Sequence, residues 1–169
     1  MGYDAPFEGL KVVDISQGVS GPYAGMLMAQ YGASVVKVEP LEGEWGRFIS
    51  RDYDKHSAFS VTTNLGKRSL ALDLKSEEGK EALRKLIHDA DIFIENFRPG
   101  VTDRLGFSYD EVSRISPKAI YLSVSGFGNG GPMRERPAMD PVLQAFSGLM
   151  SVNMGEDGIP HRVGVVICD

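Results

Sequence analysis

Short apolar runs rich in β-branched residues alternate along this sequence with segments of helical pattern. Runs of this kind, bounded by Gly, Pro and Ser, are typical of buried strands. Strands that alternate with helices favour an open, mostly parallel α/β sheet with flanking helices. The predicted strands are residues 11–15, 34–38, 69–72, 91–95, 119–124 and 162–168.

The first part of the chain predicts a compact βαβ unit. Pro22 suits the first turn of a helix over residues 23–31, because its missing N–H would be unpaired there anyway. Gly32 suits the end of that helix. The helix would connect two parallel strands by a right-handed crossover. Further helices are predicted from Ser76 to residue 89, from Ser108 with its capping-box partner Glu111 to residue 115, and over 140–150.

Composition narrows the class of protein. The 169 residues are 42% hydrophobic and 24% charged, enough for one soluble domain with a sizeable core. A formal net charge of −5 argues against nucleic acid as the main partner. The single cysteine, Cys168, excludes an internal disulfide and fits a reducing cytoplasm. No apolar run approaches the roughly 20 residues that span a bilayer, so no membrane partner is expected.

The candidate site lies in the loops that follow the strands. In open parallel sheets, ligands bind beyond the carboxyl ends of the strands. Four loops are expected there, and three of them are rich in glycine or proline. These loops are residues 16–21, 39–46, 96–100 and 125–131.

One of these loops contains a G-x-G-x-x-G pattern, formed by Gly126, Gly128 and Gly131. This pattern is typical of a dinucleotide site when a helix begins within it. Here Pro132 and Pro137 follow, and the pattern comes late in the chain. A plain glycine-rich loop is therefore favoured over a nicotinamide site.

Basic residues on the loops have two interpretations. Any one of them is explained as a solvated surface charge, whereas several at one sheet edge would clamp phosphates. The residues concerned are Lys67, Arg68, Lys75, Arg98, Arg104, Arg134 and Arg136. The histidines, His56, His88 and His161, lack metal-ligand spacing with the single cysteine, so no metal site is expected.

Asp169 follows the last apolar run, where a carboxylate can act as a nucleophile that forms an acyl intermediate. A strand-end cap or an ordinary loop acid explains it equally well. The residues by themselves thus predict an α/β domain with a phosphorylated ligand.

Five stretches in order along the chain resemble the family III CoA-transferases, which include formyl-CoA and carnitine CoA-transferases. They are GLKVVD from Gly9 with its continuation to Pro40, NLGKRSLALDLK from Asn64, ENFRPG from Glu95 with Arg104-Leu105-Gly106, YLSVSGFGNGGP from Tyr121, and DPVLQAFSG from Asp140. Together they cover nearly the whole sequence.

This resemblance implies a Rossmann-like large domain, a smaller domain, and two subunits that interlock as a homodimer. Residues 1–169 would be the N-terminal part of the large, CoA-binding domain. The small domain and the C-terminal part would be absent from this chain, so that the chain would be a fragment.

The resemblance also implies a set of coenzyme A contacts. The contacts transfer to Gln17, Gly18, Val19, Leu72, Lys75, Asn96, Phe97 and Arg104, with Arg136 as a looser match. Pro40 stands where the family often has a basic residue, so one adenine or phosphate contact differs here.

The implied reaction moves CoA between carboxylic acids, with acyl-CoA and a free acid as substrates and Asp169 as the nucleophile. Aspartyl-acyl anhydride and aspartyl-CoA thioester intermediates would form on it. An alternative is an α-methylacyl-CoA racemase of the same superfamily, whose histidine base would fall at Met139. Methionine cannot act as a base, which favours transfer. A non-catalytic CoA-binding fragment is the other alternative.

Overall fold

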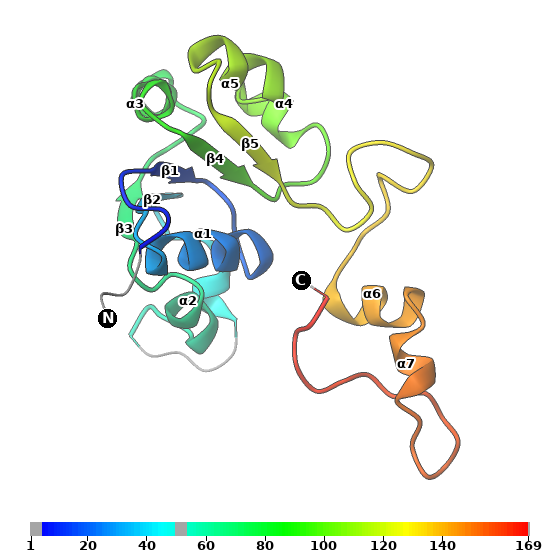
Figure 1. Ribbon diagram of the computed structural model, residues 1–169. Helices are drawn as coiled ribbons and strands as arrows, with labels where there is room; N and C mark the ends of the chain where they lie inside the picture. The colour runs from blue at the N-terminus through cyan, green and yellow to red at the C-terminus, as the bar shows by residue number, and fades with distance from the viewer. Residues whose placement is uncertain (1–4, 50–53, 169) are drawn as a thin grey trace. The chain divides into compact units, whose positions relative to one another are not determined.

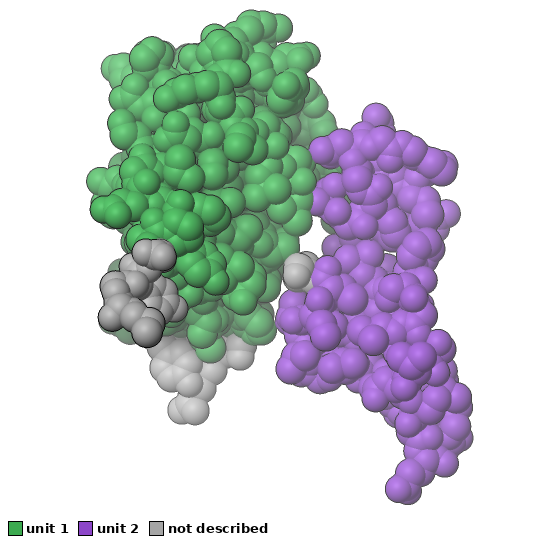
Figure 2. All heavy atoms as spheres, viewed as in Figure 1, with its two compact units in different colours: residues 1–124 green, residues 125–169 purple. Residues whose placement is uncertain are grey.

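A computed structural model describes residues 5–49 and 54–168 of the chain. The chain divides into two compact units, residues 1–124 and residues 125–169, which Figure 2 distinguishes by colour. Asp169 lies outside the described residues.

The first unit is built on a five-stranded parallel sheet (Figure 1). The strand order is β3-β2-β1-β4-β5, and every neighbouring pair is parallel. This confirms the α/β class and the first βαβ unit. The strands are β1 (Lys11–Asp14), β2 (Ser34–Glu39), β3 (Arg68–Ala71), β4 (Ile92–Glu95) and β5 (Ile120–Ser123).

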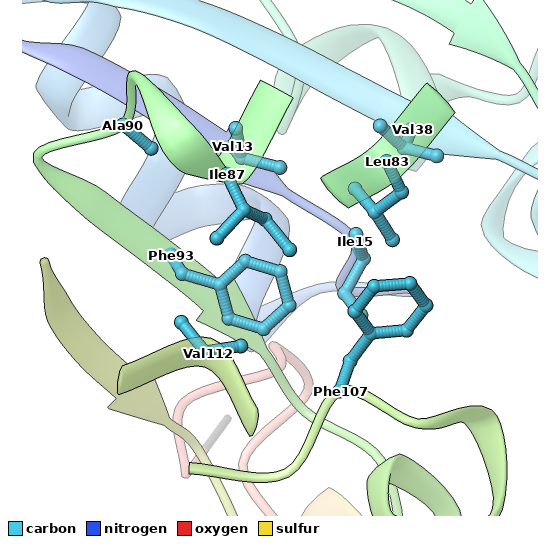
Figure 3. Packing of buried hydrophobic residues seen from close by; sticks show 9 residues of the cluster. All are labelled: Val13, Ile15, Val38, Leu83, Ile87, Ala90, Phe93, Phe107 and Val112. Carbon is cyan, nitrogen blue, oxygen red and sulfur yellow. The ribbon is translucent and has the colours of Figure 1, made fainter. Parts of the chain in front are cut away.

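Apolar residues alternate between the two faces of this sheet. Val13 and Ile15 join a cluster on one face with Leu83, Phe93 and Phe107 (Figure 3). Helices α3 (Glu77–His88) and α5 (Tyr109–Ile115) supply buried residues to this cluster. The opposite face carries a second cluster, centred on Val12, Val35, Ile92 and Ile94 and covered by α1 (Ser20–Gln30).

Some helices begin or end where their local signals predict. The Ser76 hydroxyl accepts a hydrogen bond from Gly79 N–H and caps α3, and Ser108 caps α5 in the same way. Helix α1 begins three residues before the predicted start, so Pro22 is its third residue, still among the N–H positions that lack intrahelical partners. Three short helices were not predicted: η1 (Trp45–Phe48), α2 (Ala58–Thr62) and α4 (Val101–Leu105).

The predicted helix over residues 140–150 is interrupted in the second unit. Gly148, with φ of 82°, separates α6 (Asp140–Phe146) from α7 (Leu149–Val152). A left-handed residue of this kind ends a helix, and glycine adopts it without a Cβ clash.

The strand predicted over residues 162–168 is wrong. Its backbone N–H groups bond to side chains of α6 instead of to a neighbouring strand. Val163 N–H donates to Gln144 at 2.8 Å, and the N–H groups of Ile167 and Cys168 donate to Asp140 at 2.8 Å each. A β-branched sequence forms a strand only where a partner strand offers a ladder, and among the described residues none does so here.

No helix in residues 5–49 or 54–168 is long and apolar enough to cross a membrane.

Candidate functional site

The carboxyl ends of β1 and β4 form the point at which the strand order reverses. The chain passes from β1 outward to β2 and β3, and then returns to β4 on the other side of β1. Reversal points of this kind open a crevice between the two loops that follow the strands. The loops concerned are residues 16–19 after β1 and residues 96–100 after β4.

Asn96 joins these two loops directly. Its Oδ1 accepts a hydrogen bond from Gln17 N–H at 2.7 Å, and its Nδ2 donates to Gln17 carbonyl oxygen at 2.7 Å. The neighbouring Glu95 accepts a bond from Phe97 N–H at 2.8 Å. Burial raises the pKa of Glu95, and hydrogen bonds from Ser123 and Phe97 oppose that rise. The structure thus brings Gln17 and Asn96 into direct contact, and Phe97 is the next residue along the chain.

Ser16 is fixed by charged residues of the sheet itself. Asp14 Oδ1 accepts bonds from both the N–H and the hydroxyl of Ser16, the N–H lying 2.9 Å away. Lys37 Nζ donates to the Ser16 carbonyl oxygen. All three residues are buried, with at most 2% of each exposed.

Gly18 is enclosed by residues of the loop that follows β2. Glu44 Oε2 accepts bonds from Gly18 N–H and Gly46 N–H, each at 2.8 Å. The indole of Trp45 lies so close that a Cβ built on Gly18 would come within 2.3 Å of it. Gly18 also has a φ of 80°, so glycine is required here both by space and by backbone conformation.

Lys67 is buried beside Asp14, not exposed to a ligand. Its Nζ lies 2.7 Å from Asp14 Oδ2 and also donates to Pro22 carbonyl oxygen at 2.6 Å and to Asn64 Oδ1 at 2.8 Å. Burial lowers the pKa of Lys67 to about 8, although Asp14 acts in the opposite direction. Since its donors are all used internally, Lys67 is a structural cation, contrary to both sequence interpretations.

Arg47 and Glu39 form a second ion pair in this region. Two nitrogens of Arg47 meet the two carboxylate oxygens of Glu39 at 2.6 Å and 2.7 Å. Burial raises the pKa of Glu39, but hydrogen bonds from Arg47, Glu44 N–H and Ser69 outweigh it and hold the pKa at about 2. Arg47 also contacts His56 Nδ1 at 2.9 Å.

A cavity of about 310 Å³ opens beside these pairs and is lined by residues that include Glu39, Arg47, Ser60, Asn64 and Lys67. Its Arg47 and Lys67 cations already have carboxylate partners. It therefore offers little free charge to a phosphate.

The remaining expected ligand contacts fall into two groups. Leu72 and Phe97 are half-buried and pack on the core cluster of Figure 3, beside the carboxyl edge. Lys75 and Arg104 are exposed, and neither forms an ion pair within residues 5–49 and 54–168. Pro40 directly follows β2.

The second unit carries the other predicted residues. Arg136 is exposed and stands in a turn, with its N–H bonded to Met133 carbonyl oxygen at 2.8 Å. The glycine pattern from Gly126 to Gly131 lies in an irregular, bent loop, and the next helix begins only at Asp140, as the plain-loop interpretation predicts. Met139, the position relevant to the racemase, is 66% exposed at the start of α6.

Within the described part of the chain, no group of three or more His, Cys, Asp or Glu residues is arranged to hold a metal ion.

Sequence reasoning missed four buried charges of the site, Asp14, Lys37, Glu39 and Glu44, and the partly buried Arg47 that pairs with Glu39. A signal was present, because Lys37 and Glu39 interrupt a β-branched run that predicts a fully buried strand. Charges in such a position must be paired, and paired charges in a buried strand mark a site.

Acetyl-CoA:oxalate CoA-transferase of Acetobacter aceti is 41% identical over 160 residues, covering 94% of this chain and 41% of the relative. Formyl-CoA:oxalate CoA-transferase of Streptomyces coelicolor is 44% identical over 163 residues, covering 96% of this chain and 40% of the relative. The chain thus spans about two fifths of the length of these relatives.

The fold is shared with a solved structure of a CAIB/BAIF family protein from Brucella suis. The two superpose with a TM-score of 0.91 at 37% identity, over 97% of this chain and 45% of that one. Residues 7–169 match the sequence profile of CoA-transferase family III. The match extends over nearly the whole sequence, and the chain belongs to CoA-transferase family III.

Proposed function

We propose that the protein carrying this chain moves coenzyme A between carboxylic acids. The observation that carries the proposal is the junction of the Gln17 and Asn96 loops at the reversal point of the sheet. Family membership and relatives named as CoA-transferases for oxalate and glutarate support it.

Coenzyme A would bind along this carboxyl edge. Its phosphates would meet Lys75 and Arg104, which are exposed and lack an ion pair in the described part of the chain. Its apolar portions would pack on Leu72 and Phe97, which are half-buried against the core. Charge-assisted bonds to phosphate are the stronger kind of hydrogen bond, so the cations would supply much of the affinity. Arg136, from the second unit, is proposed as a further contact.

The proposed chemistry uses Asp169 as the nucleophile. A carboxylate oxygen attacks the acyl-CoA carbonyl carbon, the C–S bond breaks, and the CoA thiolate leaves a mixed anhydride. The thiolate then attacks the aspartyl carbonyl carbon and releases the first acid as a free carboxylate, which leaves an aspartyl-CoA thioester. The acceptor acid repeats these steps in reverse and restores the Asp169 carboxylate. Four moderate substitution steps on Asp169 replace one difficult direct exchange.

The test is CoA exchange by the complete protein across a panel of acids that includes oxalate and glutarate. Transfer from acyl-CoA to at least one acid is expected. Incorporation of deuterium at the α-carbon of a 2-methylacyl-CoA, without transfer to any acid, would support the racemase instead. Binding of CoA with neither reaction would support a non-catalytic CoA-binding role.

The complete protein is proposed to be an interlocked homodimer in the cytoplasm, with acyl-CoA and a free acid as its partners and neither nucleic acid nor membrane. Apolar side chains of the second unit fit a covered surface: Phe146 is 62% exposed and Val165 61%. A monomeric mass in solution would contradict the dimer.

A further inference from the structure

The backbone from Ser16 to Gly18 is held by side chains at every polar group from the N–H of Ser16 to the N–H of Gly18. Asp14 accepts from Ser16 N–H, and Lys37 donates to the Ser16 carbonyl oxygen. The Asn96 amide takes both the N–H and the carbonyl oxygen of Gln17. Glu44 accepts from Gly18 N–H. A loop held at five successive groups has little freedom left to lose on binding a ligand.

Two of these four side chains, those of Asn96 and Glu44, belong to neither β1 nor β2. Asn96 comes from the loop after β4, and Glu44 comes from the loop after β2. They approach neighbouring residues, Gln17 and Gly18, so the loop is fixed from both of the adjoining loops.

Burial of the Glu44 carboxylate costs free energy, because one of its two oxygens has no hydrogen-bond partner among the described residues. Only 1% of it is exposed, and its Oε1 has no hydrogen-bond partner in the part of the chain that the structure describes. Its negative charge interacts favourably with Lys67 and Arg47. A buried carboxylate oxygen without a partner is expensive, and such groups persist where the geometry they impose is needed.

The five hydrogen bonds to the backbone of residues 16–18 leave few polar groups of this loop without a partner in the described part of the chain. Among the described residues, neither the side-chain amide of Gln17 nor the N–H of Val19 has a hydrogen-bond partner. The N–H groups of Gln17 and Gly18, in contrast, are already used. A hydrogen-bond acceptor at this loop would therefore be met by the Gln17 side-chain amide and by Val19 N–H, and not by Gly18 N–H.

We propose that Glu44 and Asn96 are positioning residues, which hold the Gln17–Gly18 backbone so that the Gln17 amide and Val19 N–H meet the CoA thioester in a fixed geometry. The inference rests on the proposed function. It changes the expected role of Asn96, whose amide is occupied by Gln17 and acts on the ligand through that residue. Misplacement of a reacting group by about 1 Å can reduce a rate by roughly 100-fold.

The kinetic test compares Glu44→Ala, Glu44→Gln and Ser116→Ala in the complete protein. Glu44→Ala should lower kcat for CoA transfer by roughly 100-fold and change KM much less. Glu44→Gln keeps an acceptor oxygen for Gly18 and should restore most of kcat. The control, Ser116→Ala, removes a buried hydroxyl that bonds to Ala90 at the opposite edge of the sheet and should leave kcat unchanged. If Glu44→Ala does not fold, Glu44→Asp withdraws the carboxylate by one methylene and should lose kcat likewise.

Hydrogen exchange supplies a readout that needs no substrate. Gln17 and Gly18 N–H should exchange slowly in the wild type, and Gly18 should exchange faster in Glu44→Ala. Wild-type kcat in Glu44→Ala, with faster Gly18 exchange, would overturn the positioning role and leave the proposed function intact. A wild-type protein with slow exchange but no CoA transfer would overturn the proposed function, and the positioning role with it.

Discussion

The buried carboxylate of Asp14 lies close to two lysine side chains, which the sequence alone did not predict. It lies 2.7 Å from Lys67 Nζ and 3.8 Å from Lys37 Nζ, and none of the three side chains is more than 2% exposed. The desolvation of these three charges offsets much of their attraction, so they add little net stability. Their main effect is to fix the positions of the groups that they bond. The groups concerned are those of Ser16 and the loop that follows it.

Removal of Lys67 should leave Asp14 with a buried charge that Lys37 compensates only in part. Lys67→Met is expected to lower the free energy of unfolding by about 3 kcal/mol. The control is Lys80→Met, which breaks an ion pair with the exposed Glu77 and should leave the free energy of unfolding nearly unchanged. Urea titration measures both, and equal stabilities of the two variants would contradict the structural role of Lys67.

Glu39 should make stability depend on acidity. Its pKa is lowered from 4.5 to about 2 in the folded protein, because hydrogen bonds from Arg47, Glu44 N–H and Ser69 together outweigh the opposing effect of burial. Because the folded-state pKa is the lower one, the stabilisation is complete above the unfolded pKa and is lost as pH falls toward the folded pKa. Because Arg47 is partly exposed, solvent screens its attraction for Glu39, and the expected loss in the free energy of unfolding is about 2 kcal/mol.

The measurement compares wild type with Glu39→Gln by urea titration. The wild type should be more stable near neutral pH, and the difference should shrink toward pH 2. A difference that does not vary with pH would show that Glu39 is not held ionised by Arg47.

At the scale of elements, the sequence predicts best where local signals and packing agree. Ser76 caps α3 as expected, and the β-branched runs of β1, β2 and β4 are strands because each has parallel neighbours. The same kind of run at residues 162–168 is not a strand, because its N–H groups find the side chains of Asp140 and Gln144. Whether a neighbouring strand is present to accept the backbone hydrogen bonds depends on the fold and cannot be predicted from a β-branched segment alone.

The loop after β1 offers a sharp test at this scale. Gly18→Ala would place a Cβ within 2.3 Å of the Trp45 indole, whereas Gly9→Ala, also at positive φ, meets nothing within 4 Å. Both variants carry the cost of a left-handed alanine, about 1 kcal/mol. Gly18→Ala should lose about 1–3 kcal/mol more through overpacking.

Displacement of the Trp45 indole by the new methyl group can be followed by fluorescence, since Trp45 is the only tryptophan of the chain. Gly18→Ala should change its emission, and Gly9→Ala should not. Unchanged emission in Gly18→Ala would mean that the indole does not pack on Gly18.

At the scale of the whole molecule, strand order explains how much of the site was predictable. Gln17 and Asn96 are 79 residues apart, yet they meet because β1 and β4 are neighbours, and alternation of strands and helices already predicted such a sheet edge. The buried pairs of Lys67 with Asp14 and of Arg47 with Glu39 were not predictable. They depend on which loops fold over β2, and residues 40–66 carry no periodic pattern that would indicate this.

Arg104 should contribute to CoA binding through a charge-assisted bond to phosphate. Arg104→Ala in the complete protein is expected to weaken CoA binding by about 1.5–3 kcal/mol, measured by calorimetry. Arg84→Ala is the control, because Arg84 lies on α3 and pairs with the exposed Glu81. Equal affinities of the two variants for CoA would place the phosphates elsewhere.

The central claim is that Asp169 carries the acyl group during transfer of CoA between acids. The most direct measurement is the rate of CoA transfer by Asp169→Ala in the complete protein, made alongside its affinity for CoA. Because the proposed anhydride forms on the Asp169 carboxylate, its removal should abolish transfer while CoA binding stays close to that of the wild type. Turnover retained in Asp169→Ala would contradict the account.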